Sequence, residues 1–161
     1  MTYGNLVLKL NENDLKDSNL NIFKLIINCP QLKNGLNNSS YKKITEISDI
    51  IYIIIDRVEK KKGISKKFVI GEKLYFDKSS QNFKENYSSN YLLYELQFII
   101  YHSSCSLSRG HYFAYQKIKG EWYWFNDLDS DYAQKKNPPL NDTDENSNFP
   151  VIIYYVLNTK K

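Results

Sequence analysis

The side chains of this sequence that could carry out acid–base chemistry gather between positions 108 and 127, in the stretch SRGHYFAYQKIKGEWYWFND. His111 precedes one run of alternating aromatics, and Asn126 follows a second run. The pair Lys119-Gly120 between the runs predicts a tight turn, so they should form an antiparallel hairpin that brings His111 beside Asn126. A histidine oriented by an Asn or Asp side chain makes up two thirds of a nucleophilic catalytic triad.

The neighbours of His111 favour a catalytic role, although a histidine among aromatics is also typical of an ordinary strand position. Gly110 has no side chain, which allows another backbone to approach closely. The Ser-rich segment 103–109 should form a loop over the same place. Asn126 can accept one imidazole N–H and leave the other ring nitrogen free as a base, and Asp127 adds negative charge nearby.

Four apolar segments predict the strands that position this hairpin. Leucines alternate with other residues at 6–10, and the run IIYIII at 50–55 is apolar throughout. A continuous β-branched run is typical of a central strand buried on both faces. The segment 92–102 leads toward His111, and FPVIIYYVL at 149–157 is a further strand. Another apolar run, at 22–29, stops before Pro30.

The segment 92–102 begins with strict alternation, which assigns its side chains to two faces of a sheet. One face should carry Leu92, Tyr94, Leu96 and Phe98, and the other Leu93, Glu95 and Gln97. The later segment 128–148 contains Pro138-Pro139, which is incompatible with a continuous helix or a central strand.

Composition indicates one domain built largely of sheet. The chain has 161 residues, of which 42% are hydrophobic, enough for one domain with a core. Aromatic residues make up 15% of the sequence, and together with abundant Ile they favour strands over helices.

Several classes of function are disfavoured by charge and cysteine content. The net charge of +4 comes from scattered basic residues, so we expect no nucleic-acid partner. Neither Cys29 nor Cys105 lies in a CxxC pair, so we expect no metal site, and nothing indicates a cofactor.

The N-terminus lacks a signal-peptide pattern and the longest apolar run is too short to cross a bilayer. We therefore expect no membrane partner and an intracellular protein, cytoplasmic or nuclear.

Residues 94–127 resemble the histidine box of the ubiquitin-specific proteases, which are papain-like cysteine deubiquitinases. The matching features are a strand ending in His102, a Ser-rich loop, the string GHY at 110–112 and the string WYWFND at 122–127. Upstream, IIYIIIDR at 50–57 resembles a buried strand of that family, and VIIYYVL at 151–157 resembles its closing strand. The resemblance implies an α+β, predominantly antiparallel β fold, the C-terminal part of a papain-like cysteine protease.

The resemblance also implies roles for individual residues. His111 is expected to be the general base that deprotonates a cysteine and then protonates the leaving amine. Asn126 takes the third triad position, and Asp127 assists it. A channel for the Gly-Gly tail of ubiquitin and the loop closing over it are expected to involve His102, Ser108, Arg109, Gly110 and Tyr112. The expected partner is ubiquitin or a ubiquitinated protein.

The sequence departs from the family at the nucleophile and in its domain plan. Nothing in it resembles the Asn-x-Cys box, since Cys29 precedes a proline, and a loop thiol at Cys105 would lack a helix dipole and an oxyanion hole. The family's zinc-binding CxxC pairs are absent as well. Residues 1–43 match poorly but should belong to the same domain as 44–158, which resembles the C-terminal half of the family fold.

Two main hypotheses follow. The first is that the chain is a deubiquitinase-like protein that is incomplete or inactive alone: a truncated or split gene product, a half that needs a partner chain supplying the Cys box, or a pseudoenzyme. The second is that it is a non-catalytic module that binds ubiquitin or another protein. A third reading, a structural β module that resembles the family by chance, requires the GHY and FND strings to be coincidental.

Overall fold

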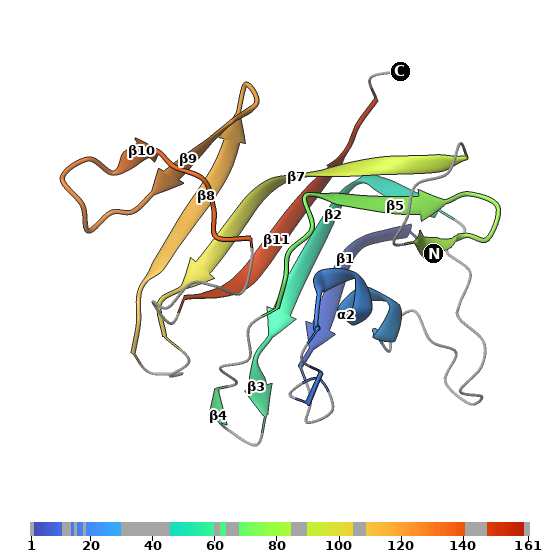
Figure 1. Ribbon diagram of the computed structural model, residues 1–161, viewed down its shortest axis with the longest axis horizontal. Coiled ribbons are helices and arrows are strands. Elements are labelled where there is room, and N and C mark those ends of the chain that lie inside the picture. The colour runs from blue at the N-terminus through green and yellow to red at the C-terminus, as the bar shows by residue number, and fades with distance from the viewer. Residues whose placement is uncertain are drawn as a thin grey trace.

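A computed structural model describes residues 2–10, 14, 16–17, 19–29, 46–59, 62–63, 68–84, 90–104, 109–140 and 148–159 (Figure 1). The strands are β1 (Thr2–Lys9), β2 (Glu46–Asp56), β3 (Val58–Glu59), β4 (Lys62–Gly63), β5 (Lys73–Asp77), β6 (Asn82–Lys84), β7 (Tyr91–His102), β8 (Tyr112–Ile118), β9 (Glu121–Phe125), β10 (Ala133–Lys135) and β11 (Phe149–Leu157), and the helix is α2 (Ile22–Asn28).

Nine of the described strands form one sheet, in the order β1-β2-β11-β7-β8-β9-β10, with β5 paired to β7 and β6 paired to β5. β1 and β2 run parallel, whereas the other pairs of this sheet are antiparallel. The predicted α+β, predominantly antiparallel fold is therefore confirmed. The strands of the predicted hairpin, β8 and β9, extend to the left in Figure 1, away from α2.

The apolar run at 22–29 forms α2, which covers part of one face of the sheet (Figure 1). Asn21 caps the helix, since its side-chain oxygen accepts a hydrogen bond from the backbone N–H of Lys24 at 2.9 Å. Ile22, Leu25 and Ile26 recur at helical spacing and are buried in the core. The core of the protein therefore lies between α2 and one face of the sheet.

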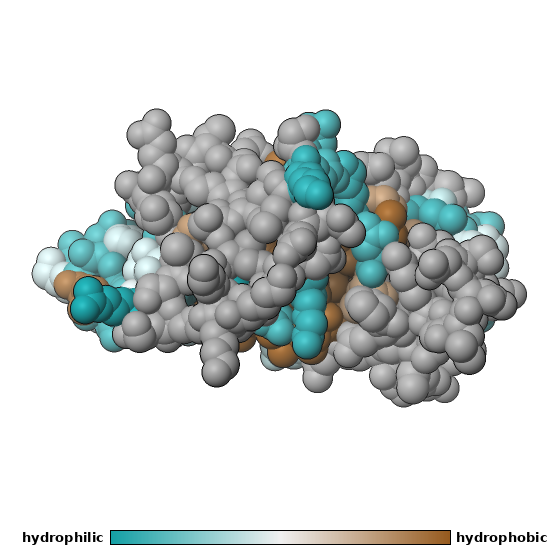
Figure 2. Space-filling model, turned by 90° about the horizontal axis from the view of Figure 1, so that it is seen from below, coloured by the Kyte–Doolittle hydropathy of each residue, from teal (hydrophilic) through white to brown (hydrophobic). Residues whose placement is uncertain are grey.

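The segment 50–55 lies in the interior of the sheet as predicted, because β2 pairs with β1 on one side and β11 on the other. The expected burial on both faces is wrong. Ile51, Ile53 and Ile55 are buried, whereas Tyr52 and Ile54 are 43% and 41% exposed. Side chains alternate along a strand, and the core occupies only one of the two faces. Seen from below, apolar side chains reach the surface near the middle of the molecule (Figure 2).

β7 contains a bulge that changes which side chains face the core. Leu96 and Phe98 pair with consecutive residues of β11, so Gln97 is an extra residue in β7. Tyr94 and Leu96 share the buried face, but beyond the bulge Ile99 is buried and Phe98 is only half-buried. The predicted placement of Phe98 on the same face as Tyr94 and Leu96 is wrong because one extra residue reverses the alternation.

The predicted turn at Lys119-Gly120 is confirmed. Ile118 pairs with Glu121, which leaves the two residues between them as the loop. Their φ angles are +52° and +88°, the positive values that a two-residue type I′ hairpin turn requires. The hairpin therefore returns the end of β9 to the level at which β8 begins.

A buried arginine ties the end of β2 to the start of β11. Arg57 Nε donates a hydrogen bond to the carbonyl of Pro150 at 3.2 Å. Its guanidinium carbon lies 4.9 Å from the ring centre of Phe149 and 5.4 Å from that of Phe68.

Within the described part of the chain, no helix is long and apolar enough to cross a membrane.

Candidate active site

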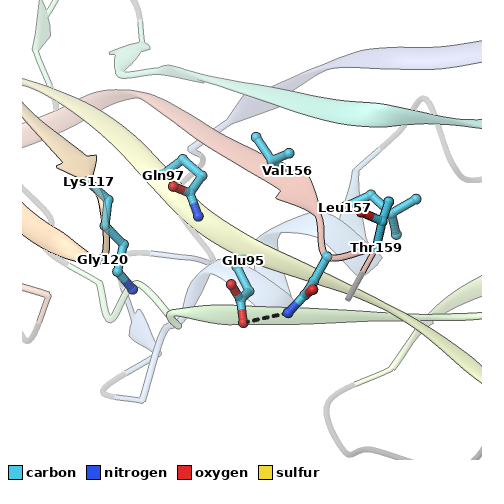
Figure 3. A pocket seen from close by; sticks show the side chains of 8 residues that line it. Glu95, Gln97, Lys117, Gly120, Val156, Leu157 and Thr159 are labelled. Carbon is cyan, nitrogen blue, oxygen red and sulfur yellow. Dashed lines mark hydrogen bonds between the residues drawn. The ribbon is translucent and has the colours of Figure 1, made fainter. Parts of the chain in front are cut away.

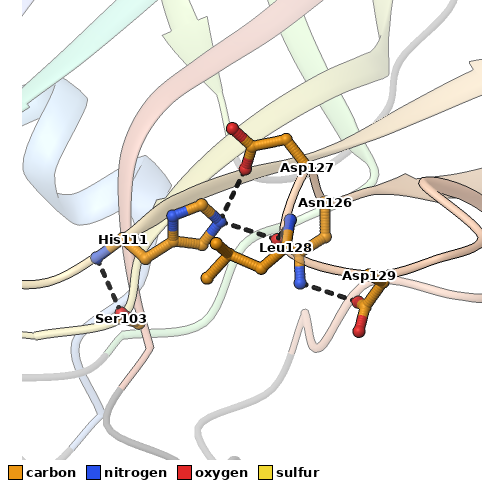
Figure 4. Close-up of polar contacts among 6 residues, drawn as sticks. All are labelled: Ser103, His111, Asn126, Asp127, Leu128 and Asp129. Atoms are coloured by element: carbon orange, nitrogen blue, oxygen red, sulfur yellow. Dashed lines mark hydrogen bonds and ion pairs between the residues drawn. The ribbon is translucent and has the colours of Figure 1, made fainter.

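The hairpin brings its histidine and asparagine into direct contact (Figure 4). His111 lies just before β8 and Asn126 just after β9, and Nε2 of the imidazole is 2.6 Å from Oδ1 of Asn126. Asp127 Oδ1 lies 3.1 Å from the same nitrogen. The predicted proximity of these residues, which are 15 positions apart in sequence, is therefore present in the structure.

The two oxygens around Nε2 determine which imidazole nitrogen can act as a base. An amide oxygen and a carboxylate oxygen both accept hydrogen bonds, so Nε2 carries the proton of the neutral ring. Nδ1 then holds the lone pair. The side chain of His111 is 27% exposed, so the ring is partly shielded but still accessible. A neutral imidazole of this tautomer can take a proton at Nδ1.

The backbone of His111 is fixed by Ser103, a contact that no sequence pattern indicated. The N–H of His111 donates to the hydroxyl of Ser103 at 2.9 Å, and the N–H of Ser103 donates to the carbonyl of His111 at 2.9 Å (Figure 4). Ser103 directly follows β7, whose last residue, His102, pairs with Tyr112. The register between β7 and β8 therefore sets the position of the His111 backbone, and with it the position of the imidazole, along the hairpin.

Asn126 is held by backbone and side-chain hydrogen bonds. Its N–H donates to the carbonyl of Tyr132 at 3.0 Å, and its Oδ1 accepts from the N–H of Leu128 at 3.3 Å. Its Nδ2 donates to Oδ2 of Asp129 at 2.7 Å. Asp129 was not among the predicted site residues, because contacts within a short irregular loop leave no periodic signal in the sequence.

Gly110 packs directly against His102. It has a φ of +129°, and a Cβ at this position would lie 2.5 Å from His102 Nε2 and 3.0 Å from Ser104 Cβ. The imidazole of His102 is itself held, because Nδ1 is 2.5 Å from the carbonyl oxygen of Ser104 and the ring centre is 4.5 Å from that of Tyr112. The close approach expected at Gly110 is therefore made with a side chain of β7.

An open, mainly apolar groove of about 380 Å³ lies beside the contact between His111 and Asn126. It is lined by Ile100, Tyr112, Phe113, Ala114, Phe125, Asn126, Asp127 and Tyr132. Tyr112 and Tyr132 are 62% and 68% exposed, and Leu128, which lies beside the imidazole in Figure 4, is 72% exposed. Asn126 and Asp127, which both contact His111, thus line a groove with exposed aromatic side chains.

The remaining predicted residues are placed as follows. Arg109 is exposed, beside Gly110. Ser108 and Cys105 lie outside the described residues. Cys29 is buried, with its Sγ 3.6 Å from the carbonyl oxygen of Val7 in β1. In the sheet order, β1 and β8 are four strand spacings apart, roughly 19 Å at about 4.8 Å each, so the Cys29 thiol is remote from the start of β8.

A second cavity, of about 430 Å³, lies near the hairpin turn, at the opposite end of β8 and β9 from His111 (Figure 3). Its lining includes Glu95, Lys117 and Gly120, and Glu95 accepts a hydrogen bond from Asn158 at 3.0 Å. Among the described residues, no group of three or more His, Cys, Asp or Glu side chains is arranged to hold a metal ion. The lining of this cavity contains no His or Cys side chain.

The side chains with strongly shifted pKa values lie away from the candidate site. Hydrogen bonds from the side chains of Ser79 and Ser80 lower the pKa of Asp77 to about 2. Burial raises the pKa of Tyr94 and of Tyr155 well above the usual range of a phenol. These groups contribute to the fold rather than to chemistry at His111.

Solved structures with low sequence identity share this fold. One is a chain of the SAGA Ubp8/Sgf11/Sus1/Sgf73 DUB module bound to ubiquitin aldehyde, with 17% identity and a TM-score of 0.63 over 98% of this chain and 36% of that chain. Another is a chain of the Saccharomyces cerevisiae apo Pan2 pseudoubiquitin hydrolase-RNA exonuclease module in complex with AAUUAA RNA, with 15% identity and a TM-score of 0.59 over 94% of this chain and 28% of that chain. The chain thus spans about a third of the length of these proteins.

Sequence comparison gives the family. No curated protein matches the chain. The family model described as ubiquitin carboxyl-terminal hydrolase matches residues 8–155, which include β2, β7, the β8–β9 hairpin and most of β11. With this match over most of its length, and with the fold of a DUB module chain, the protein belongs to the ubiquitin carboxyl-terminal hydrolase family.

Proposed function

We propose that this chain carries the base half of a thiol-dependent site that acts on ubiquitin or a ubiquitinated protein. The observation that supports this proposal is the 2.6 Å contact between His111 Nε2 and Asn126 Oδ1, which leaves Nδ1 as a base. In this role His111 takes the thiol proton at Nδ1, and the resulting imidazolium later protonates the leaving amine. Asn126 keeps the ring oriented, and Asp127 stabilises the imidazolium from the solvent side.

The substrate proposal rests on the family and on the groove. A chain of similar fold belongs to a module that was solved bound to ubiquitin aldehyde. In our proposal the ubiquitin tail passes beside Gly110 and Tyr112 and is covered by the loop that contains Ser108 and Arg109, with His102 beneath it. A tail that ends in two glycines presents backbone without side chains, so it fits closely against Gly110 and Tyr112.

The nucleophile is proposed to come from outside the present sequence. Cys29 is buried beside β1 and remote from β8, and no segment of the sequence resembles an Asn-x-Cys box. We propose that a partner chain supplies this box and that the chain alone has negligible turnover, since loss of a triad nucleophile lowers catalysis by several orders of magnitude.

A second candidate function is a non-catalytic module that binds ubiquitin or another protein. The exposed aromatic side chains of Tyr112 and Tyr132 beside the groove favour this candidate, because aromatic residues are enriched in protein interfaces. One of the proteins of similar fold is itself described as a pseudoubiquitin hydrolase. In this case the His111–Asn126 contact serves only to order the groove.

Titration of the chain with ubiquitin, followed by calorimetry and by NMR, tests both candidates. We expect binding stronger than about 1 mM, equivalent to about 4 kcal/mol, with signal changes around Gly110 and Tyr112. The variant Tyr112→Ala should weaken binding, whereas the matched control Tyr52→Ala, on β2, should not. Absence of any signal change at millimolar ubiquitin would contradict the first candidate, and for the second it would exclude ubiquitin and leave another protein as the partner.

A ubiquitin propargyl probe tests the proposed lack of turnover. We expect no covalent product with the chain alone, and labelling at Cys29 or Cys105 would show that it contains its own nucleophile. The variant His111→Ala separates the two candidates: the binding module retains its biological effect, whereas a base-bearing half loses it while remaining folded.

A further inference from the structure

The orientation of the Asn126 amide decides which nitrogen of His111 is the base. An asparagine side chain presents an oxygen acceptor on one side and an NH2 donor on the other, and the two are similar in shape. If the oxygen faces the imidazole, Nε2 carries the proton and Nδ1 is free. If the NH2 group faces it, Nε2 must accept, and the proton moves to Nδ1. An aspartate at this position would have no such ambiguity, because both of its oxygens accept.

Two neighbours of Asn126 distinguish its oxygen from its nitrogen (Figure 4). The backbone N–H of Leu128 can only donate, and it lies 3.3 Å from Oδ1. The carboxylate of Asp129 can only accept when ionised, and its Oδ2 lies 2.7 Å from Nδ2. The second contact is shorter and involves a full charge, so it is the stronger of the two.

We propose that Asp129 is a positioning residue that selects the amide orientation of Asn126 and, through it, the tautomer of His111. A flipped amide would place Oδ1 against the Asp129 carboxylate and NH2 against the Leu128 N–H, so both contacts would become repulsive. Asp129 thus allows a neutral asparagine to act with the directionality of an aspartate. The catalytic meaning of this arrangement rests on the proposed function, but the arrangement itself is independent of ubiquitin.

The influence of Asp127 on the His111 tautomer must be separated from that of Asp129, because the Asp127 carboxylate also accepts from Nε2 at 3.1 Å. Its side chain is 84% exposed, so water competes for that contact. The variant Asp127→Ala, which keeps the chain of contacts from Asp129 through Asn126 to His111, should retain the tautomer. The double variant Asp127→Ala/Asp129→Ala should lose it.

Nitrogen-15 NMR of the full chain near neutral pH measures both orientation and tautomer. In the wild type we expect distinct protonated and unprotonated ring-nitrogen signals for His111, and a side-chain NH2 of Asn126 that is protected from hydrogen exchange. Asp129→Ala should lower that protection by about tenfold or more, and in the Asp127→Ala background the two ring signals should move toward each other. Asp129→Glu, which keeps a carboxylate that can only accept, should retain the wild-type pattern.

The matched control is Asp131→Ala, which removes the same charge from an exposed position two residues along the loop. It should leave both signals unchanged. The proposal is overturned if the double variant keeps separate ring signals, or if Asp131→Ala shifts them as far as Asp129→Ala does. A failed ubiquitin titration would leave this result intact, so the two proposals fail separately.

Discussion

Replacement of Gly110 by alanine should destabilise the protein in two separable ways. The φ of +129° is strained for alanine, which costs about 1–3 kcal/mol. The new Cβ would also lie 2.5 Å from Nε2 and 2.6 Å from Cε1 of His102. Because that ring is held by Ser104 and Tyr112, it cannot move without losing contacts, and overpacking of this kind costs a further 1–3 kcal/mol or so.

Gly120 provides a matched control within the same hairpin. Its φ is +88°, but nothing lies within 4 Å of a Cβ built there. Gly120→Ala should therefore incur the backbone cost alone. The difference between the two variants in the free energy of unfolding, measured by urea denaturation, isolates the contact with His102. We expect it to be about 1–3 kcal/mol, equivalent to a few degrees in the melting temperature for a chain of this size.

A double-mutant cycle tests the assignment of that difference to His102. In His102→Ala/Gly110→Ala the partner of the clash is absent, so the added cost at Gly110 should fall to that of Gly120→Ala. If Gly110→Ala is no more destabilising than Gly120→Ala, or if the cycle shows no coupling, the close approach of Gly110 to His102 is not what requires glycine at this position.

Three further predictions concern the sheet and its surroundings. Ile53→Ala should lower the free energy of unfolding by about 2–5 kcal/mol, whereas Ile54→Ala should lower it by about 1 kcal/mol or less, and equal effects in urea denaturation would contradict one-sided burial of β2. Tyr155→Phe should cost about 1–2 kcal/mol, because the hydroxyl donates to the carbonyl of Gly71 at 2.6 Å within the core; a melting temperature unchanged from wild type would argue against that bond. The pKa of Asp77 is lowered to about 2 from 3.8, so the stabilising effect of its carboxylate should be complete above pH 3.8 and lost as the pH falls through about 2. A difference in the free energy of unfolding between wild type and Asp77→Asn that does not change with pH across this window would exclude that role.

The sequence allowed the hairpin and its His–Asn contact to be predicted because both depend on local, regular features. Lys119-Gly120 specifies a two-residue turn, and the strand pairing that starts from this turn fixes which residues lie opposite one another. Ala114 pairs with Phe125, so counting from the turn places Asn126 level with Phe113, two residues from His111, and the two side chains come close together. The interior placement of the 50–55 strand followed in the same way from its apolar composition.

Features that depend on tertiary contacts were missed or wrong. The apolar run at 50–55 could not reveal that Tyr52 and Ile54 face outward, since burial depends on what covers each face. Ser103 and Asp129 contact the site through irregular loops, where spacing carries no periodic information. The bulge at Gln97 was hidden because a residue that interrupts the alternation looks like any other polar residue in the sequence.

That bulge links the core to the candidate site. Before it, the even-numbered side chains of β7 point inward, and after it the odd-numbered ones do. If the same residues ran through Gln97 as a regular strand without the bulge, the inward series that begins at Tyr94 would continue through Ile100 to His102, and the imidazole would enter the core instead of lying beneath Gly110. One strand therefore has two opposite phases, and the bulge between them lets Ile99 and Tyr101 build the interior while His102 supports the histidine loop.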